Sequence, residues 1–123
     1  MLPFARVTII GLGLIGSSLA RAIRADMPTV QVTGHDADAA VRDIARRIDL
    51  CDDITDTAGA SVTDADLVIL CVPVRAMGAV AAEIADDLPA DAIVSDVGSC
   101  KADVLAQLST ALPGRTIIPA HPV

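Results

Sequence analysis

Short apolar runs alternate with amphipathic segments along the chain. The runs predict strands at Arg6–Ile10, Val30–Gly34, near Ile54, Leu67–Val72, Ala92–Ser95 and Thr116–Ile118. Between them, apolar residues three and four positions apart predict helices at Leu14–Ala25, Asp38–Ile48, Arg75–Leu88 and Cys100–Leu112. The segment 50–64 is polar and weakly patterned apart from the short strand expected near Ile54. Regular strand–helix alternation favours a parallel sheet with right-handed crossovers.

The same periodicity predicts which helix positions face the core. These are Ile15, Leu19, Ala22 and Ile23 in the first helix, Val41, Ile44, Ala45 and Ile48 in the second, and Val80, Ala81, Ile84 and Leu88 in the third. Hydrophobic residues make up 53% of the 123 residues but aromatic residues only 1%, so the core must be aliphatic. Such a core suits parallel strands that are buried on both faces. The length fits one domain, residues 1–123.

Charge and composition narrow the functional classes. The net charge of −7 disfavours a nucleic-acid partner, and no apolar run reaches the roughly 18 residues of a membrane span. The stretch 6–22 is similar in composition to a signal peptide, but the same residues fit better the glycine-rich motif described next. The three cysteines include no C-x-x-C pair, so we expect no metal site and no disulfide framework. A cytoplasmic location is therefore expected.

A glycine-rich turn joins the first strand to the first helix. Gly11, Gly13 and Gly16 form G-x-G-x-x-G, in which the glycines permit a tight turn, close approach of a pyrophosphate and close helix packing. The helix start favours the phosphate charge. The pattern predicts a Rossmann-type α/β fold, doubly wound, with a mostly parallel sheet of about six strands and helices on both faces. The predicted cofactor-binding residues here are Gly11, Leu12, Gly13, Leu14, Ile15 and Gly16.

Asp36 lies at the end of the second strand, 20 residues after Gly16. At this spacing a carboxylate accepts hydrogen bonds from the ribose hydroxyls of NAD and would repel the additional phosphate of NADP. No arginine follows immediately, since the nearest, Arg42, is a turn into the next helix. We therefore expect NAD as the cofactor. The alternative interpretation makes Asp36 the N-cap of the second helix, although Asp38 could serve equally well.

Val72 and Pro73 follow the central apolar strand. Ligands of open α/β sheets bind outside the carboxyl ends of the strands, so the backbone of these two residues is a candidate wall for the nicotinamide half of the cofactor. In the alternative interpretation, Pro73 only ends the strand.

Two later loops also follow strands and should face the same cleft. Ser99 lies in the loop 95–101 and His121 in the segment 118–122. A histidine beside a nicotinamide can accept the proton of a substrate hydroxyl as hydride leaves, and a serine can hydrogen-bond the same oxygen. From the residues alone, Ser99 could equally be a helix N-cap and His121 a surface histidine.

These motifs together resemble the N-terminal domain of the prephenate and arogenate (cyclohexadienyl) dehydrogenase family. The resemblance covers essentially the whole chain, and its most specific part is the Asp-Val-Gly-Ser-x-Lys loop followed some twenty residues later by His-Pro. It rests on residues 7–18, Gly34-His35-Asp36, Cys71-Val72-Pro73-Val74, Asp96-Val97-Gly98-Ser99-Cys100-Lys101 and Ala120-His121-Pro122.

The resemblance implies an NAD-dependent oxidative decarboxylation of prephenate or arogenate in tyrosine biosynthesis. The substrate loses hydride from the carbon bearing its ring hydroxyl while the ring carboxylate leaves as CO₂. By analogy His121 would polarise the hydroxyl, and Ser99 would lie between hydroxyl, histidine and nicotinamide, serving both catalysis and cofactor binding. Lys101 matches the motif, whereas Cys100 stands where the family commonly has Val.

The family normally continues past the His-Pro motif into a helical region that supplies substrate-binding residues and a dimer interface. The 123 residues do not include it, so we expect this chain alone to bind NAD but to turn over little substrate, and we expect a homodimer for a full-length member. Two alternatives remain: a non-catalytic NAD-binding module, or another Rossmann oxidoreductase of the β-hydroxyacid dehydrogenase type. The choice between prephenate and arogenate stays open.

Overall fold

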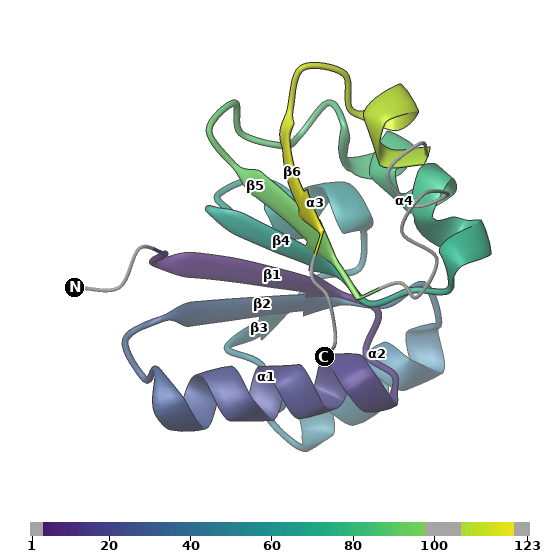
Figure 1. The fold of residues 1–123 in the computed structure, drawn as a ribbon. Coiled ribbons are helices and arrows are strands. Elements are labelled where there is room, and N and C mark those ends of the chain that lie inside the picture. Colours follow the sequence, from purple (N-terminus) through teal and green to yellow (C-terminus); the bar gives the residue numbers. More distant parts are fainter. Residues whose placement is uncertain (1–3, 98–106, 120–123) are drawn as a thin grey trace.

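The structure is a computed structural model that describes residues 4–97 and 107–119. Six parallel strands form one sheet in the order β3-β2-β1-β4-β5-β6 (Figure 1). The direction of strand succession reverses between β1 and β4, as in a doubly wound sheet. The Rossmann-type fold is therefore confirmed. The strands are β1 (Arg6–Ile10), β2 (Gln31–His35), β3 (Asp53–Ile54), β4 (Leu67–Leu70), β5 (Ile93–Asp96) and β6 (Thr116–Pro119).

Helices cover both faces of the sheet. In Figure 1, α1 and α2 lie on one face, and α3 and α4 lie on the other. The helical elements are α1 (Leu14–Asp26), α2 (Ala39–Arg47), α3 (Ala58–Val62), the 3₁₀ turn η1 (Val74–Ala76) and α4 (Met77–Ile84). Residues 107–111 are also helical and belong to the last predicted helix, whose earlier residues lie outside the described part of the chain.

The predicted strands are confirmed to within about two residues, but the helix prediction missed α3. This helix has only five residues, which is too short for a periodic pattern to emerge. It begins where the hydroxyl of its N-cap Thr57 accepts a hydrogen bond from the backbone N–H of Ala60, at 3.2 Å. The predicted third helix is also divided, because it opens with the 3₁₀ turn η1 before α4 begins.

Two aliphatic cores lie on opposite faces of the sheet. Since side chains alternate along a strand, β1 sends Val7 and Ile9 to one core and Ile10 to the other. The core beneath α1 and α2 includes Val7, Ile9, Ala20, Ile23, Val32, Ala45 and Ile54. The core beneath α3 and α4 includes Ile10, Val62, Val68, Leu70, Met77, Ala81, Ile84, Val94 and Leu108.

Several predicted inward positions are wrong. In α1 the buried residues are Gly16, Ala20 and Ile23, while Ile15, in the first turn of the helix, is 58% exposed. Ala22 is also exposed. In α2, Ile44 and Ile48 are half exposed and only Ala45 is buried, because this helix packs beside the two-residue edge strand β3.

The loops after the central strands leave the sheet at one edge. Backbone hydrogen bonds continue the ladder past the strand ends, from the N–H of Gly11 to the carbonyl of His35 (2.8 Å) and from the N–H of Cys71 to the carbonyl of Ile10 (2.7 Å). The N–H of Val97 similarly reaches the carbonyl of Leu70, at 3.2 Å. This regular carboxyl edge fixes the positions from which the site is built.

Two negative findings concern the described residues only. Across 4–97 and 107–119, the structure contains no helix of the length and apolar character needed to cross a bilayer. The same residues contain no cluster of three or more His, Cys, Asp or Glu side chains arranged to hold a metal ion.

We predict that Ile84→Ala lowers the free energy of unfolding by about 2–5 kcal/mol, because Ile84 is fully buried between α4 and the sheet. The matched variant Ile44→Ala should cost less than about 1 kcal/mol, since Ile44 is 55% exposed. Urea denaturation measures both. Equal losses for the two variants would contradict the assignment of the core faces.

Candidate nucleotide-binding site

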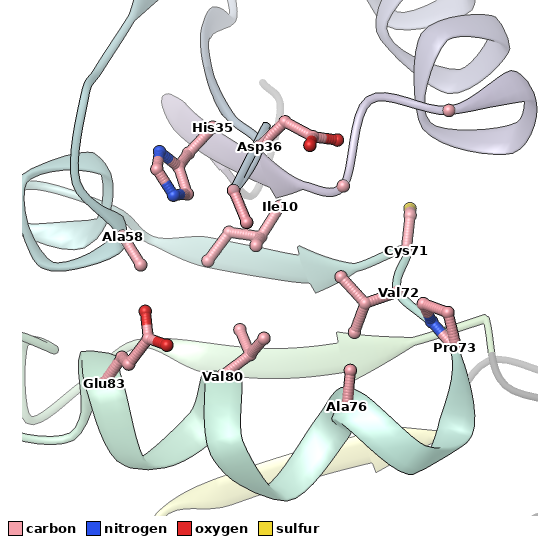
Figure 2. A pocket seen from close by; sticks show the side chains of 13 residues that line it. Ile10, His35, Asp36, Ala58, Cys71, Val72, Pro73, Ala76, Val80 and Glu83 are labelled. Atoms are coloured by element: carbon pink, nitrogen blue, oxygen red, sulfur yellow. The ribbon is translucent and has the colours of Figure 1, made fainter. Parts of the chain in front are cut away.

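A cavity of about 340 Å³ opens at the carboxyl edge of the sheet (Figure 2). It lies where β1 and β4 are neighbours and their following loops diverge, which is the place where open α/β sheets bind ligands. The cavity is lined by Ile10, Gly11, Gly13, His35, Asp36, Ala37, Ala58, Cys71, Val72, Pro73, Ala76, Val80 and Glu83.

Two of the three motif glycines are required by the protein's own packing. Gly11 has a φ of +99°, and a Cβ there would lie 2.4 Å from the carbonyl oxygen of Cys71. A Cβ on Gly16 would lie 1.8 Å from the carbonyl oxygen of Gly11. Gly16 therefore lets the helix approach the glycine turn itself, which sharpens the predicted role in helix packing.

Gly13 differs from the other two glycines. A Cβ at this position would meet no atom within 4 Å, and its φ of −73° is accessible to any residue. Neither packing nor backbone conformation therefore demands glycine here. The space in front of Gly13 belongs to the cavity, where a missing side chain admits the close approach of a ligand.

The amino end of α1 faces this space with backbone N–H groups that have no partner within the helix. Gly13 is the N-cap and provides no side-chain acceptor, and the first turn contains no acidic residue. The first helical hydrogen bond runs from the N–H of Ser17 to the carbonyl of Gly13, at 2.9 Å. The preceding N–H groups have no partner within the helix, so together with the helix dipole they favour an anion.

The carboxylate of Asp36 joins the end of β2 to the glycine turn. Its Oδ2 accepts a hydrogen bond from the N–H of Leu12 at 2.8 Å, and its Oδ1 accepts one from the N–H of Asp38 at 2.9 Å. Asp38 in turn is the N-cap of α2, accepting from the N–H of Ala40. The alternative interpretation of Asp36 as the N-cap is therefore wrong. Because a carboxylate has about four acceptor positions, that of Asp36 can accept further hydrogen bonds.

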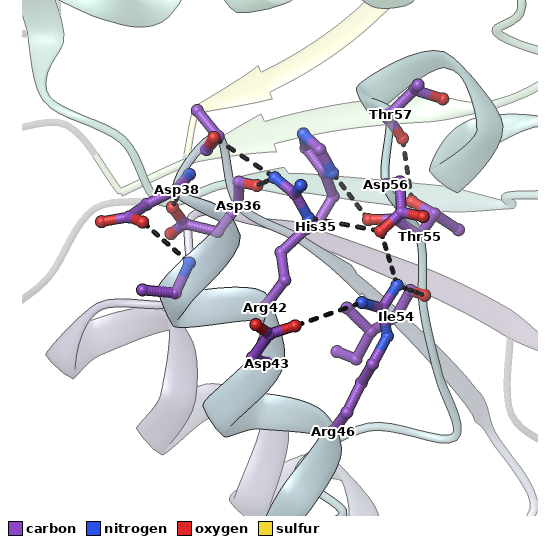
Figure 3. Close-up of polar contacts among 12 residues, drawn as sticks. His35, Asp36, Asp38, Arg42, Asp43, Arg46, Ile54, Thr55, Asp56 and Thr57 are labelled. Carbon is purple, nitrogen blue, oxygen red and sulfur yellow. Dashed lines mark hydrogen bonds and ion pairs between the residues drawn. The ribbon is translucent and has the colours of Figure 1, made fainter.

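Arg42 lies near this carboxylate, and its guanidinium group is hydrogen-bonded to backbone carbonyl oxygens (Figure 3). Its Nη1 donates to the carbonyl oxygens of Asp36 (2.9 Å) and Ala37 (3.2 Å), and its Nε lies 3.4 Å from a carboxylate oxygen of Asp56. The side chain is only 16% exposed. Arg42 thus supports the loop after β2, and no Lys or Arg appears among the described lining residues of the cavity.

Asp56 is itself held by a second arginine. A hydrogen bond from Arg46 to its carboxylate, 2.7 Å long, lowers the pKa of Asp56 below its ordinary value. The carboxylate of Asp56 is therefore ionised at neutral pH and pairs with the guanidinium groups of both Arg42 and Arg46 (Figure 3).

His35 is buried at the end of β2. Its Nδ1 lies 2.9 Å from the carbonyl oxygen of Thr55, and since a carbonyl can only accept, Nδ1 carries the proton. This bond ties the end of β2 to the segment that enters α3. The other edge of the imidazole ring faces the cavity (Figure 2).

The opposite wall of the cavity is apolar and comes from the connection between β4 and α4. Val72 and Pro73 line it, as predicted, together with Ala76 and Val80. Cys71 closes the wall. Burial raises the pKa of its thiol to about 11, so it remains protonated at neutral pH and forms a neutral surface.

The structure brings together five predicted cofactor residues: Gly11, Gly13, Asp36, Val72 and Pro73 all line the cavity. The remaining residues of the turn lie elsewhere. Leu12 is buried and contributes through its backbone N–H, and Gly16 is buried beneath the turn, whereas the side chains of Leu14 and Ile15 are 87% and 58% exposed.

The predicted catalytic residues Ser99 and His121 lie outside the described residues. The strands that precede them are nevertheless neighbours, since Asp96 and Pro119 are register partners in β5 and β6. Asp96, the first residue of the motif that contains Ser99, is completely buried at the carboxyl edge of the sheet.

Sequence reasoning missed several lining residues: His35, Ala37, Ala58, Ala76, Val80 and Glu83. A signal existed for three of them. Ala76, Val80 and Glu83 are spaced i, i+4 and i+7 directly after a strand end, which places them on one helix face. Ala58 had no signal, because α3 itself was not predicted.

The strand order and the glycine turn define the Rossmann class of nucleotide-binding α/β domains. The chain belongs to the family described as "Prephenate dehydrogenase, nucleotide-binding domain", whose model matches residues 19–123. The family resemblance carried by the sequence motifs is thereby confirmed.

Individual relatives agree with this assignment. The chain is 50% identical to cyclohexadienyl dehydrogenase of Zymomonas mobilis over all 123 residues, covering 42% of that protein. It is also similar to Aquifex aeolicus prephenate dehydrogenase, whose crystal structure is in complex with hydroxyphenyl propionate and NAD+. The TM-score is 0.87 and the identity 30%, and the match covers 99% of this chain and 43% of that one. The chain matches 40% of Synechocystis arogenate dehydrogenase with 95% of its length, a TM-score of 0.83 and 26% identity. The chain thus spans about two-fifths of these relatives.

We predict opposite behaviour for two glycine substitutions. Gly16→Ala should lower the free energy of unfolding by about 2 kcal/mol or more, because the new Cβ clashes with the backbone of Gly11. Gly13→Ala should cost no more than about 1 kcal/mol, since its Cβ meets open space. Chemical denaturation of both variants tests this. A Gly13→Ala protein as unstable as Gly16→Ala would show that packing, and not the cavity, requires Gly13.

Proposed function

We propose that this chain is the NAD-binding domain of a dehydrogenase that oxidatively decarboxylates prephenate or arogenate in tyrosine biosynthesis. Family membership supports the reaction class, and favours it over a β-hydroxyacid dehydrogenase. The activity belongs to a protein longer than these residues, since the relatives are more than twice as long. The observation that carries the cofactor assignment is the Asp36 carboxylate, held against the glycine turn at the mouth of the cavity.

The described residues fit a dinucleotide in three parts. The open space at Gly13 and the N–H groups in the first turn of α1 suit the diphosphate. Asp36 retains acceptor positions for the hydroxyls of the adenosine ribose. The apolar wall between Ala58 and Val80 suits a planar base.

The charges around the cavity favour NAD over NADP. The two oxygens of the Asp36 carboxylate accept hydrogen bonds from backbone N–H groups. A 2′-phosphate on the ribose would face this carboxylate, and the two negative charges would repel each other. The nearest guanidinium, that of Arg42, donates to the carbonyls of Asp36 and Ala37 and pairs with Asp56. It would have to abandon these partners to neutralise a phosphate.

When bound, NAD⁺ supplies the hydride acceptor for the reaction. We propose that the backbone of Val72 and Pro73 flanks the nicotinamide half, and that His121 accepts a hydrogen bond from the substrate hydroxyl and polarises it. Ser99 would donate to the same oxygen and contact the cofactor. The support for these two roles is the motif in which each residue lies and the pairing of the strands that precede them.

We expect a cytoplasmic protein whose partner is a small dicarboxylate substrate and whose full-length form is a homodimer. The acidic net charge of −7 disfavours a nucleic-acid partner.

The role of Asp36 can be tested by substitution. Asp36→Ala and Asp36→Ser should weaken NAD⁺ binding about tenfold or more, because hydrogen bonds to a charged acceptor are lost, and should narrow the difference between NAD⁺ and NADP⁺. Isothermal titration calorimetry measures both affinities. Asp26→Ser, which removes an exposed carboxylate at the far end of α1, is the matched control. An unchanged NAD⁺/NADP⁺ ratio in the Asp36 variants would reject the ribose assignment.

The role of His121 requires a protein that spans the full length of the relatives. There, His121→Asn should lower kcat by about 10²-fold or more, the contribution typical of a positioned acid–base group, while NAD⁺ affinity stays within about twofold. Steady-state kinetics with prephenate and with arogenate, alongside NAD⁺ titration, separate the two effects. Turnover equal to that of the unsubstituted enzyme would return His121 to the surface-residue interpretation.

A further inference from the structure

The cavity contains two polar groups to which the proposed function has given no task. Glu83 extends from α4 and His35 from the end of β2, and both line the cavity. Figure 2 shows them with Ala58 at one end of the cavity, while Cys71, Val72 and Pro73 lie at the other. The carboxylate of Glu83 points from the helix toward Ala58.

The space between these ends is a slot with apolar walls. Ala76 and Val80 form one side, on the same helix face as Glu83, and Ile10 forms the other (Figure 2). Such walls contact the two faces of a planar ring without forming hydrogen bonds to it. Hydrogen bonds that distinguish one planar ring from another in this slot must therefore come from the polar side chains at its end.

Both groups at that end are hydrogen-bond acceptors. Glu83 is exposed, and an ionised carboxylate can only accept. His35 donates from Nδ1 to the carbonyl of Thr55, so in the neutral imidazole the remaining nitrogen, Nε2, is an acceptor. Two acceptors at one end of an apolar slot select a ring edge that carries two N–H bonds.

We infer that Glu83 and His35 recognise the 6-amino group of adenine and make the cavity discriminate against 6-oxo purines. An exocyclic amino group has two N–H bonds and can satisfy both acceptors. Hypoxanthine can offer its N1–H to one acceptor, but its O6 then faces the other without a proton between them. This inference rests on the proposed binding of NAD and names the residues that choose its base.

The test is isothermal titration calorimetry of the purified chain with NAD⁺ and with nicotinamide hypoxanthine dinucleotide, which differ only at the 6 position of the purine. The unsubstituted chain should bind NAD⁺ about tenfold or more tightly than the hypoxanthine analogue, because an acceptor loses its donor. In Glu83→Gln the difference should fall to about threefold or less, since an amide can either accept from an amino group or donate to an oxo group.

Two further variants sharpen the test. His35→Asn keeps a donor for the Thr55 carbonyl and removes the acceptor at Nε2, so the preference for NAD⁺ should narrow. Asp86→Asn removes an exposed carboxylate just beyond α4, outside the cavity lining, and should keep the full preference. Thermal melting verifies that each variant is folded.

The outcomes separate this inference from the proposed function. A chain that binds both dinucleotides equally, or a Glu83→Gln variant that keeps the full preference, would overturn the inference while leaving NAD binding intact. A chain that binds neither dinucleotide would overturn the proposed function, and the inference with it.

Discussion

The hydrogen bond between the carboxylate of Asp36 and the backbone N–H of Leu12, 2.8 Å long, holds the site together. It connects the loop after β2 to the glycine turn after β1, two segments whose bonded residues are 24 positions apart in the sequence. The turn can reach the carboxylate only because Gly11 adopts a positive φ and Gly16 leaves room for the carbonyl above it. The conformation of the glycine turn, the start of α1 and the Asp36 carboxylate are thus parts of one arrangement.

The electrostatics of the cavity follow from this arrangement. The chain is acidic, and the charged side chains among the described lining residues are Asp36 and Glu83, both negative. Positive potential for a diphosphate therefore comes from the backbone N–H groups and dipole at the start of α1. Because the nearby guanidinium of Arg42 is turned toward carbonyl oxygens, the end of the cavity at Asp36 stays negative. A ligand with a central diphosphate and an unphosphorylated ribose matches this distribution.

Much of the fold could be predicted because its signals are local. The strands are continuous aliphatic runs, and the glycine turn reveals itself through spacing and through its place between strand and helix. What the sequence does not reveal is how the helices and strands pack against one another. Nothing in the sequence near Ile44 indicates that its helix lies over a two-residue edge strand, and a helix as short as α3 leaves no periodic signal. Ala58 lies on that helix, and the His35 imidazole is hydrogen-bonded to the carbonyl of Thr55, 20 residues away, so no local pattern in the sequence reveals this end of the site.

The proposed site places the adenosine ribose of NAD on Asp36, in the cavity at the carboxyl edge of the sheet. A crystal structure of the chain grown with NAD⁺ tests it most directly. We expect ribose hydroxyl oxygens within about 3.2 Å of the Asp36 carboxylate and a diphosphate in front of Gly13. A dinucleotide bound elsewhere on the sheet, or bound in the cavity with its ribose turned away from Asp36, would contradict it.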